Sequence, residues 1–359
     1  MEFSLFYFAD DRASADGRYR LLLDGARFAD THGFAAVWTP ERHFHEFGGQ
    51  YPNPAVTGAA LAVATDRVAI RAGSVVAPLH HPLRIAEEWS VVDNLSDGRV
   101  GIAFASGWHA VDFALRPETY ERRKDVLLET VDTVRRLWRQ ESVPFPDGTG
   151  EETPLRIYPA PVQPELPIWI TSAGSVESFR AAGRLGAGVL THLLGQELDD
   201  LAKRIAVYRE EFAASQGPDA GSGHVALMLH TYIGTDRAQV RELVRGPFSS
   251  YIRSSIGLIA RAAQGAAAGF DPERLAPADR EFLVSRSFDR YFETGGLFGT
   301  VADGEEMIGR LAALGIDDVA CLIDFGVDPE LVLEGLDRLD ELRRRCLAGG
   351  VGGTAGSGS

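Results

Sequence analysis

The sequence predicts an α/β protein folded as a (β/α)8 TIM barrel, with one domain over residues 1–348. Short apolar segments alternate with longer amphipathic segments, and eight such pairs follow one another along the chain. The apolar segments are mostly continuous hydrophobic runs, which is the pattern of parallel strands buried on both faces. The first of them ends in FADDRASADG without a GxGxxG turn, which argues against a doubly wound open sheet.

The eight predicted strands are short runs rich in aliphatic and aromatic residues. They cover residues 3–8, 35–41, 68–76, 99–107, 167–174, 186–193, 224–234 and 319–325. The N-terminal run has neither a basic segment before it nor a small-residue cleavage site after it, so we interpret it as a strand and not as a signal peptide.

Each predicted strand leads into a segment with helical periodicity. The predicted helices cover residues 18–33, 53–66, 82–98, 118–140, 175–186, 197–215, a segment from about Asp236, and 328–347. Gly33 is expected to end the first helix, because glycine readily adopts the left-handed conformation of a helix C-terminus. Pro54 lies at the first turn of the second helix, where its missing N–H costs nothing.

Two segments exceed ordinary loop lengths, and a short tail completes the chain. Residues 141–166 form a Pro- and Gly-rich insertion that contains the strand-like sequence LRIYPAPVQ (155–163). Residues 257–303 form a mixed, partly helical insertion between the seventh strand and the eighth helix, and we expect it to act as a lid over the barrel mouth. The Gly- and Ser-rich residues 349–359 are expected to be a disordered tail.

The composition limits the classes of partner. The formal net charge is -15, which disfavours nucleic acid and anionic membranes, and no apolar run is long enough to span a membrane. The two cysteines, Cys321 and Cys346, do not form a disulfide framework. These observations predict a cytoplasmic protein.

In this fold the active site forms at the carboxyl ends of the strands. The residues that follow the predicted strands form a polar, His-rich rim, which suits proton transfer near neutral pH. The rim comprises Glu41 to His45, Gly73 and Ser74, Pro78 to Pro82, Ser106 to Phe113, Ser172 to Ser175, and Thr191 with His192. His43 is the leading catalytic candidate, because it lies within a dense charged cluster at a strand end.

The segment Ser172–Ser175 leads directly into a helix, so its amides and the hydroxyls of Ser175 and Ser178 are candidates to hold a phosphate. A plain serine N-cap explains the same residues equally well. The sequence HFH at 43–45 also resembles the paired histidines of metal hydrolases, but no complete ligand set follows from the spacing, and no metal is expected.

The longer segments resemble the bacterial luciferase family of flavin-dependent monooxygenases. The resemblance rests on AAVWTPERHFHEFGGQYPNP (35–54) and VVAPLHHPLRIAEEWSVVDNLSDGRVGIAFASGW (75–108), and it extends over nearly the whole chain. The sequences SGWHAVDF (106–113), ETYERRK (118–124) and RYFETGGLFGT (290–300) are similar to a subfamily of natural-product biosynthesis that works within or beside polyketide and nonribosomal peptide assembly lines.

The resemblance implies roles for residues at matching positions. His43 and Asp112 would be catalytic, His43 beside the flavin and Asp112 as a rim acid. Gly73 and Ser74 would lie under the isoalloxazine, where the family often has a non-prolyl cis peptide. The flavin phosphate would be contacted by Ser106, Trp108, Ala173, Gly174, Ser175 and Ser178. Luciferases have an arginine where this chain has Ser106, so another cation, from the second half of the chain, is expected to do its work.

The activity that the resemblance implies is an FMNH2- and O2-dependent monooxygenation through a peroxyflavin. The reduced FMN would come from a separate NAD(P)H:flavin reductase, and the substrate would be a natural-product intermediate, such as an acyl or aminoacyl group on a carrier protein. Family members are commonly homodimers. The alternatives are a deazaflavin (F420)-dependent oxidoreductase of the same superfamily, a non-catalytic flavin-binding barrel, and a metal-dependent hydrolase.

Overall fold

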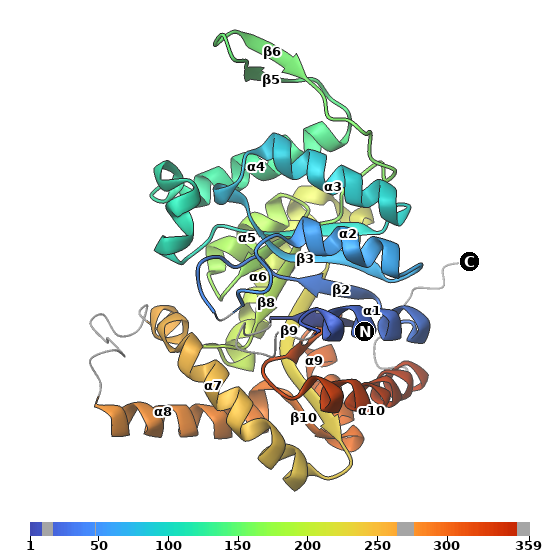
Figure 1. Cartoon of the computed structure of the whole chain (residues 1–359), viewed down its shortest axis with the longest axis vertical. Coiled ribbons are helices and arrows are strands. Elements are labelled where there is room, and N and C mark those ends of the chain that lie inside the picture. Colours follow the sequence, from blue (N-terminus) through green and yellow to red (C-terminus); the bar gives the residue numbers. More distant parts are fainter. Residues whose placement is uncertain (9–16, 47, 264–275, 350–359) are drawn as a thin grey trace.

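The computed structural model of the chain describes residues 1–8, 17–46, 48–263 and 276–349 (Figure 1). At its centre eight parallel strands pair in the order of the sequence and close into a barrel through the pairing of β8 with β9. The barrel strands are β1 (Glu2–Tyr7), β2 (Ala36–Thr39), β3 (Ala69–Val76), β4 (Val100–Ala105), β7 (Ile168–Ser172), β8 (Gly188–His192), β9 (Val225–Gly234) and β11 (Asp318–Asp324). Each lies within or overlaps one predicted strand, so the predicted barrel is confirmed.

Helices surround the barrel and follow the strands in the predicted alternation. They are α1 (Arg20–His32), α2 (Pro54–Ala64), α3 (Pro82–Ser96), α4 (Arg123–Trp138), α5 (Val176–Arg184), α6 (Leu198–Gln216), α7 (Arg237–Ala263), α8 (Pro277–Arg290), α9 (Val301–Ala313) and α10 (Pro329–Ala348). Gly33 ends α1 in the left-handed conformation, at φ 76°, as the sequence predicts. The Asn53 side chain caps α2 by accepting the amides of Ala55 and Val56. No helix in the described ranges is long and apolar enough to cross a membrane.

The insertion at 141–166 contains an antiparallel hairpin, β5 (Val143–Pro146) and β6 (Glu152–Leu155), which projects from the barrel at the top of Figure 1. The prediction of a strand over 155–163 is wrong, because β6 ends at Leu155. Pro159 and Pro161 follow, and a proline has no N–H for a strand ladder.

The segment between β9 and β11 contains α7, α8, the short strand β10 (Leu297–Thr300) and α9. β10 extends the sheet by pairing with the last four residues of β9, beyond the part of β9 that pairs with β11. Of the predicted lid, residues 264–275 lie outside the described residues, as does the predicted tail from residue 350. In Figure 1, α7 and α8 lie together on one side of the molecule.

A buried charged cluster closes the N-terminal end of the barrel. The Asp318 carboxylate is fully buried and accepts hydrogen bonds from Arg71 Nη1 at 3.1 Å and Ser4 Oγ at 2.8 Å. The Arg71 guanidinium also lies over the rings of Trp38 and Trp169, 5.1 and 4.7 Å from their centres. A buried carboxylate needs such a partner, because an unpaired charge in the interior is costly.

Among the described residues one group has the composition of a metal site, and it lies at this N-terminal end: Glu2, His224 and Asp318. The Trp169 indole N–H donates to His224 Nδ1 at 2.9 Å. An indole nitrogen can only donate, so a neutral His224 carries its proton on Nε2, the atom that faces Glu2 at 3.6 Å. That protonated nitrogen has no lone pair for a metal ion. Neither His43 nor His45 belongs to this group.

Candidate active site

A cavity of about 250 Å³ opens at the carboxyl ends of the barrel strands. The strands and the loops that follow them supply most of its wall, and α7 adds Tyr251 and Ser254. The wall also includes Phe6, Phe8, Pro40, Glu41, Arg42, Gly73, Ser74, Val76, Ala105, Ser106, Gly107, Trp108, Asp112, Thr171, Ala173, Leu190, Thr191, His192, Leu194 and Met228. The cavity is therefore largely apolar, with a few polar groups that converge on it, as is typical of a small-molecule site.

Glu41, which follows β2, is the centre of a buried hydrogen-bond network. Its Oε1 accepts from His43 Nε2 at 2.7 Å and from His80 Nε2 at 2.6 Å, and its Oε2 accepts from the Val76 amide at 2.7 Å. Burial acts to raise the pKa of Glu41, but the hydrogen bonds from the two histidines outweigh it and hold the pKa below its ordinary value. Glu41 is therefore a carboxylate that orients two imidazoles.

The same bonds fix the histidine tautomers. Because a carboxylate only accepts, both Nε2 atoms carry a proton, and Nδ1 of His43 is the nitrogen left to exchange one. At His80 burial acts to lower the pKa, but the hydrogen bond to Glu41 raises it above its ordinary value. His43 does not line the cavity. It is hydrogen-bonded to Glu41, which does line the cavity.

Arg42 and Asp112 meet in the wall next to this network. Both side chains are more than nine-tenths buried, and Arg42 Nη1 lies 3.5 Å from Asp112 Oδ2. The other Asp112 oxygen lies 3.2 Å from His109 Nδ1. Trp108 places its ring 5.0 Å from the centre of the Arg42 guanidinium. Asp112 is thus a shared partner of a cation and a histidine.

Gly73 and Ser74 form part of the cavity wall at β3, and the peptide bond between them is cis. A Cβ at Gly73 would stand 2.6 Å from the Phe6 ring and 3.1 Å from the Trp38 ring, so only glycine fits there. The Ser74 hydroxyl shares a 2.6 Å hydrogen bond with that of Thr171 on β7. This bond ties two strands together across the cavity wall and leaves bare backbone facing the cavity.

The turn from Ala173 to Ser175 links β7 to α5, and Ser178 lies in the first turn of that helix. Ser175 is the N-cap of α5, and its hydroxyl accepts the Ser178 amide at 3.4 Å, while the Gly174 amide donates to Ser172 Oγ at 3.3 Å. The first amides of a helix have no partner inside the helix, so this turn can bind an anion. Ala173 is the member of the turn that belongs to the cavity wall.

A cation from the second half of the chain lies at this turn. A Cβ built on Gly174 would stand 3.6 Å from the central carbon of the Arg204 guanidinium, which comes from α6. Arg204 Nη1 donates to the Gln196 amide oxygen at 2.8 Å, and its Nε has no partner among the described residues. Ser106, where the resemblance calls for an arginine, lies in the cavity wall with its hydroxyl near the Gly107 carbonyl oxygen.

Two further histidines lie at the cavity, the half-buried His192 in its wall and the buried His230 outside the wall, and sequence reasoning missed His230 and placed His192 only at the rim. Burial lowers the pKa of His192, on β8, to about 4, and its Nδ1 has no hydrogen-bond partner in the described ranges. Burial, and the nearby His192, lower the pKa of His230, on β9, to about 3. Both rings are therefore neutral at physiological pH. The apolar context of His230, MLHTY, gave no signal that its ring would be enclosed by aromatic side chains.

The structure brings most of the predicted site residues to one place. Six of them line the cavity: Gly73, Ser74, Ser106, Trp108, Asp112 and Ala173. Gly174, Ser175 and Ser178 continue outward from Ala173 along the turn, and His43 is joined to the wall through Glu41. Sequence reasoning missed Arg204 and the α7 contribution, because both lie inside helices and not at the strand ends where the rim was sought.

The chain matches known proteins over nearly its full length. The family described as Luciferase-like monooxygenase matches residues 1–341. The oxygenase component of a flavin-dependent trigonelline monooxygenase from Acinetobacter baylyi is 26% identical over 358 residues, covering 94% of this chain and 93% of that protein. An F420-dependent glucose-6-phosphate dehydrogenase from Amycolatopsis mediterranei is 33% identical over 190 residues, covering 50% of this chain and 55% of that protein.

Solved structures share the fold. Monooxygenase RslO1 from Streptomyces bottropensis superposes with a TM-score of 0.77 at 24% identity, covering 97% of this chain and all of that one. A second structure is the oxygenating constituent of 3,6-diketocamphane monooxygenase from Pseudomonas putida, a type II Baeyer–Villiger monooxygenase in complex with FMN. It gives a TM-score of 0.71 at 19% identity, covering 95% of this chain and 97% of that chain.

Proposed function

The chain belongs to the luciferase-like monooxygenase family, and from that premise we propose that it is an FMNH2- and O2-dependent monooxygenase. One oxygen atom would enter the substrate, the other would leave as water, and the flavin would be oxidised. The observation that carries this proposal is a cavity at the strand ends that is lined by Gly73, which has no side chain, and by Ser74, with an anion-binding turn at one end.

The residues present fit a flavin mononucleotide. The apolar wall and the backbone at Gly73–Ser74 suit a flat aromatic ring, and the amides at the start of α5 suit a phosphate. Arg204 would supply the positive charge that Ser106 cannot, and Ser175 and Ser178 would add contacts to the phosphate, whereas Trp108, whose ring lies against Arg42, would contact another part of the flavin. When bound, reduced FMN would supply the electrons that activate O2.

The side chains of this protein would manage protons and water. The Glu41 carboxylate would hold His43 so that Nδ1 takes up or delivers a proton at the reacting centre. His192, held neutral by burial, would offer a hydrogen bond from the β8 side without adding charge. The aromatic and aliphatic wall, with Tyr251 of α7, would keep bulk water out while α7 and α8 act as the lid.

We infer from subfamily resemblance that the substrate is a natural-product intermediate, such as an acyl or aminoacyl group on a carrier protein. A separate NAD(P)H:flavin reductase would supply FMNH2, as the name of the trigonelline relative, an oxygenase component, suggests. Cys321 and Cys346 are both free and buried, which suits the cytoplasm as the place of action.

A homodimer is supported by an apolar surface on the adjacent helices α2 and α3. Val56 is 66% and Val63 is 72% exposed on α2, and Val91 and Leu95 are exposed on α3. Apolar residues gathered on one surface mark an interaction site, and a two-fold axis would bury the same surface on each protomer.

The second candidate is an F420-dependent oxidoreductase that transfers hydride without O2. The match to the Amycolatopsis dehydrogenase favours this candidate, because that relative is 33% identical to the chain and the trigonelline relative 26%. The dehydrogenase match covers 50% of this chain. A non-catalytic flavin-binding barrel is the third reading, and the intact Glu41 network argues against it.

Binding and turnover separate these candidates. The purified chain should quench FMN fluorescence with micromolar or better affinity and bind F420 at least about tenfold more weakly. With a flavin reductase, NADH, O2 and a candidate substrate, it should incorporate one atom of ¹⁸O2 into product, and His43→Ala should uncouple reduced-flavin oxidation from product. Preferential binding of F420, or product formed at an equal rate without O2, would refute the proposal.

A further inference from the structure

The guanidinium of Arg42 is buried in the cavity wall with most of its hydrogen-bond donors unused. Its side chain is 6% exposed, and it has five N–H groups in a planar fork. One of these approaches Asp112 at 3.5 Å, the long limit of a hydrogen bond, and the buried Nε has no partner among the described residues. The Nε atom is closed off from the cavity, so a ligand there would complete the guanidinium through its terminal N–H groups.

The neighbouring acids are committed to other groups. Glu41 accepts hydrogen bonds from two imidazoles and a backbone amide, so its oxygens are already bonded to groups other than Arg42. Asp112 divides its two oxygens between Arg42 and His109. Burial lowers the pKa of Arg42, but an arginine keeps its proton at any physiological pH. The wall at this point therefore presents the permanent positive charge of Arg42 beside two buried carboxylates, of which Asp112 pairs with it at 3.5 Å.

Arg42 also lies away from the turn where the flavin phosphate would bind. It follows β2, whereas the turn follows β7, and β3 and β4 separate those strands in the barrel. The turn has its own cation in Arg204. The Arg42 guanidinium lies over the Trp108 ring, 5.0 Å from its centre. The two arginines thus serve different parts of the cavity.

We propose that Arg42 binds a carboxylate carried by the part of the substrate that enters the cavity. The planar fork of arginine matches the two oxygens of a carboxylate, and such charge-assisted pairs are both strong and directional. This inference rests on the proposed function and deepens it: the oxidised substrate is an anion, and its carboxylate sets which carbon faces the flavin.

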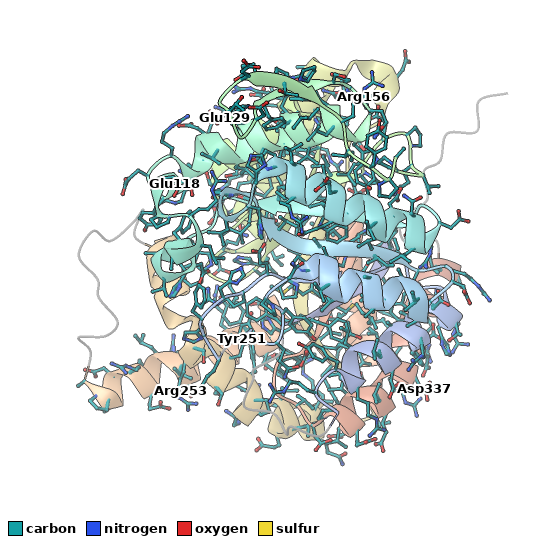
Figure 2. All side chains as sticks on the ribbon, turned by 45° about the horizontal axis from the view of Figure 1, so that its top comes forward. Glu118, Glu129, Arg156, Tyr251, Arg253 and Asp337 are labelled. Carbon is teal, nitrogen blue, oxygen red and sulfur yellow. The ribbon has the colours of Figure 1, made fainter. Side chains whose placement is uncertain are left out.

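Matched acid and amide probes test the proposal without knowledge of the natural substrate. Isothermal titration of the full chain saturated with FMN compares benzoate with benzamide and hexanoate with hexanamide. Each acid should bind at least about tenfold more tightly than its amide, because only the acid completes the guanidinium. Arg42→Gln should abolish the preference, and Arg42→Lys should retain part of it. Arg156→Gln, next to the hairpin and far from Tyr251 in Figure 2, removes the same charge elsewhere and should change nothing.

Two controls keep the outcomes distinct. The double variant Arg42→Gln/Asp112→Asn removes both buried charges, so it should fold even where the single variant does not, and it should show the same lost preference. Equal affinity for acid and amide in the unaltered chain, or a preference that survives Arg42→Gln, would overturn the inference. A tenfold weaker Kd for FMN in Arg42→Gln would overturn it too, by assigning Arg42 to the flavin. Acid preference without FMN binding would instead refute the proposed function alone.

Discussion

Acid should destabilise this protein through His230, and replacing that ring should remove the effect. His230 is 4% exposed, and its ring lies 4.5 Å from that of Phe248 and 4.3 Å from that of Tyr251. Burial, then the nearby His192, lower its pKa to about 3, whereas an unfolded histidine titrates near 6.5. At pH values between the folded pKa and the unfolded pKa, the unfolded state binds more protons than the folded state. The stability that comes from a neutral His230 is therefore complete above pH 6.5 and is lost as the pH falls toward 3.

The size of the effect follows from the two pKa values. Lowering the pH from 7.5 to 5.0 should reduce the free energy of unfolding by about 2 kcal/mol through His230 alone. Asp324 acts in the opposite direction, since burial raises its pKa to about 7 and its protonation stabilises the fold as the pH falls. The absolute pH profile mixes these two groups with His192, whose pKa burial lowers to about 4. A comparison of the unaltered chain with His230→Leu, which is close in volume, cancels the contribution of Asp324.

Urea denaturation at pH 7.5 and 5.0, followed by tryptophan fluorescence, measures both proteins. The difference in unfolding free energy, His230→Leu minus the unaltered chain, should rise by about 2 kcal/mol when the pH is lowered from 7.5 to 5.0. This holds whatever the difference between the two proteins at pH 7.5. His32→Leu, at a half-buried histidine outside this cluster, serves as the matched control. A relative stability that stays constant within about 0.5 kcal/mol would show that His230 is not held neutral by burial.

Three further predictions follow from buried charges. Arg71→Met leaves the buried Asp318 without its cation and should lower the free energy of unfolding by about 3–5 kcal/mol in urea denaturation, with partial rescue by the added change Asp318→Asn. Asp324→Asn removes the acid-stabilised carboxyl, so its unfolding free energy should fall by about 2 kcal/mol more than that of the unaltered chain between pH 7.5 and 5.0. Glu41→Gln should cut coupled oxygenation at least about tenfold and shift the pH profile of that reaction, because the substitution releases His43. The FMN affinity should stay unchanged within about twofold, because the substitution does not touch the proposed flavin contacts. An unaltered pH profile would contradict this prediction.

The barrel could be predicted because its signals are local. Each strand is a continuous apolar run and each helix carries its own periodicity and caps, such as Gly33 and Asn53, so no long-range knowledge was needed. β6 was misplaced because apolar residues in 155–163 resemble a strand, while the prolines among them prevent one. β10 is four residues long and contains Gly299, so its pairing depends on β9 lying beside it rather than on its own sequence.

The site was predictable to the extent that it follows the strand-end rule. That rule gave Gly73, Ser74, Ser106 and Ala173 as neighbours, although they are up to a hundred residues apart. The rule singled out His43 within its cluster, whereas the structure places Glu41 at the centre of the hydrogen-bond network. The role of Glu41 depends on His80, which the loop after β3 brings beside it, and this contact cannot be seen in the sequence. No pattern in the sequence of α6 marks Arg204, because its position depends on how α6 packs against α5.

The positions of the two arginines have a consequence for the orientation of the reactants. If Arg204 holds the phosphate of the cofactor at the start of α5 and Arg42 holds the carboxylate of the substrate after β2, the cavity is anchored at both ends by fixed charges. The Glu41 network then lies at the substrate end, because Arg42 follows Glu41 directly and Val76, which bonds to Glu41, lies in the same wall. Nδ1 of His43 would thus face the region where substrate and flavin meet. Lengthening a carboxylate substrate by one methylene at its far end should accordingly leave the oxidised carbon at the same number of bonds from the carboxylate, and mass-spectrometric mapping of the products would show whether it does.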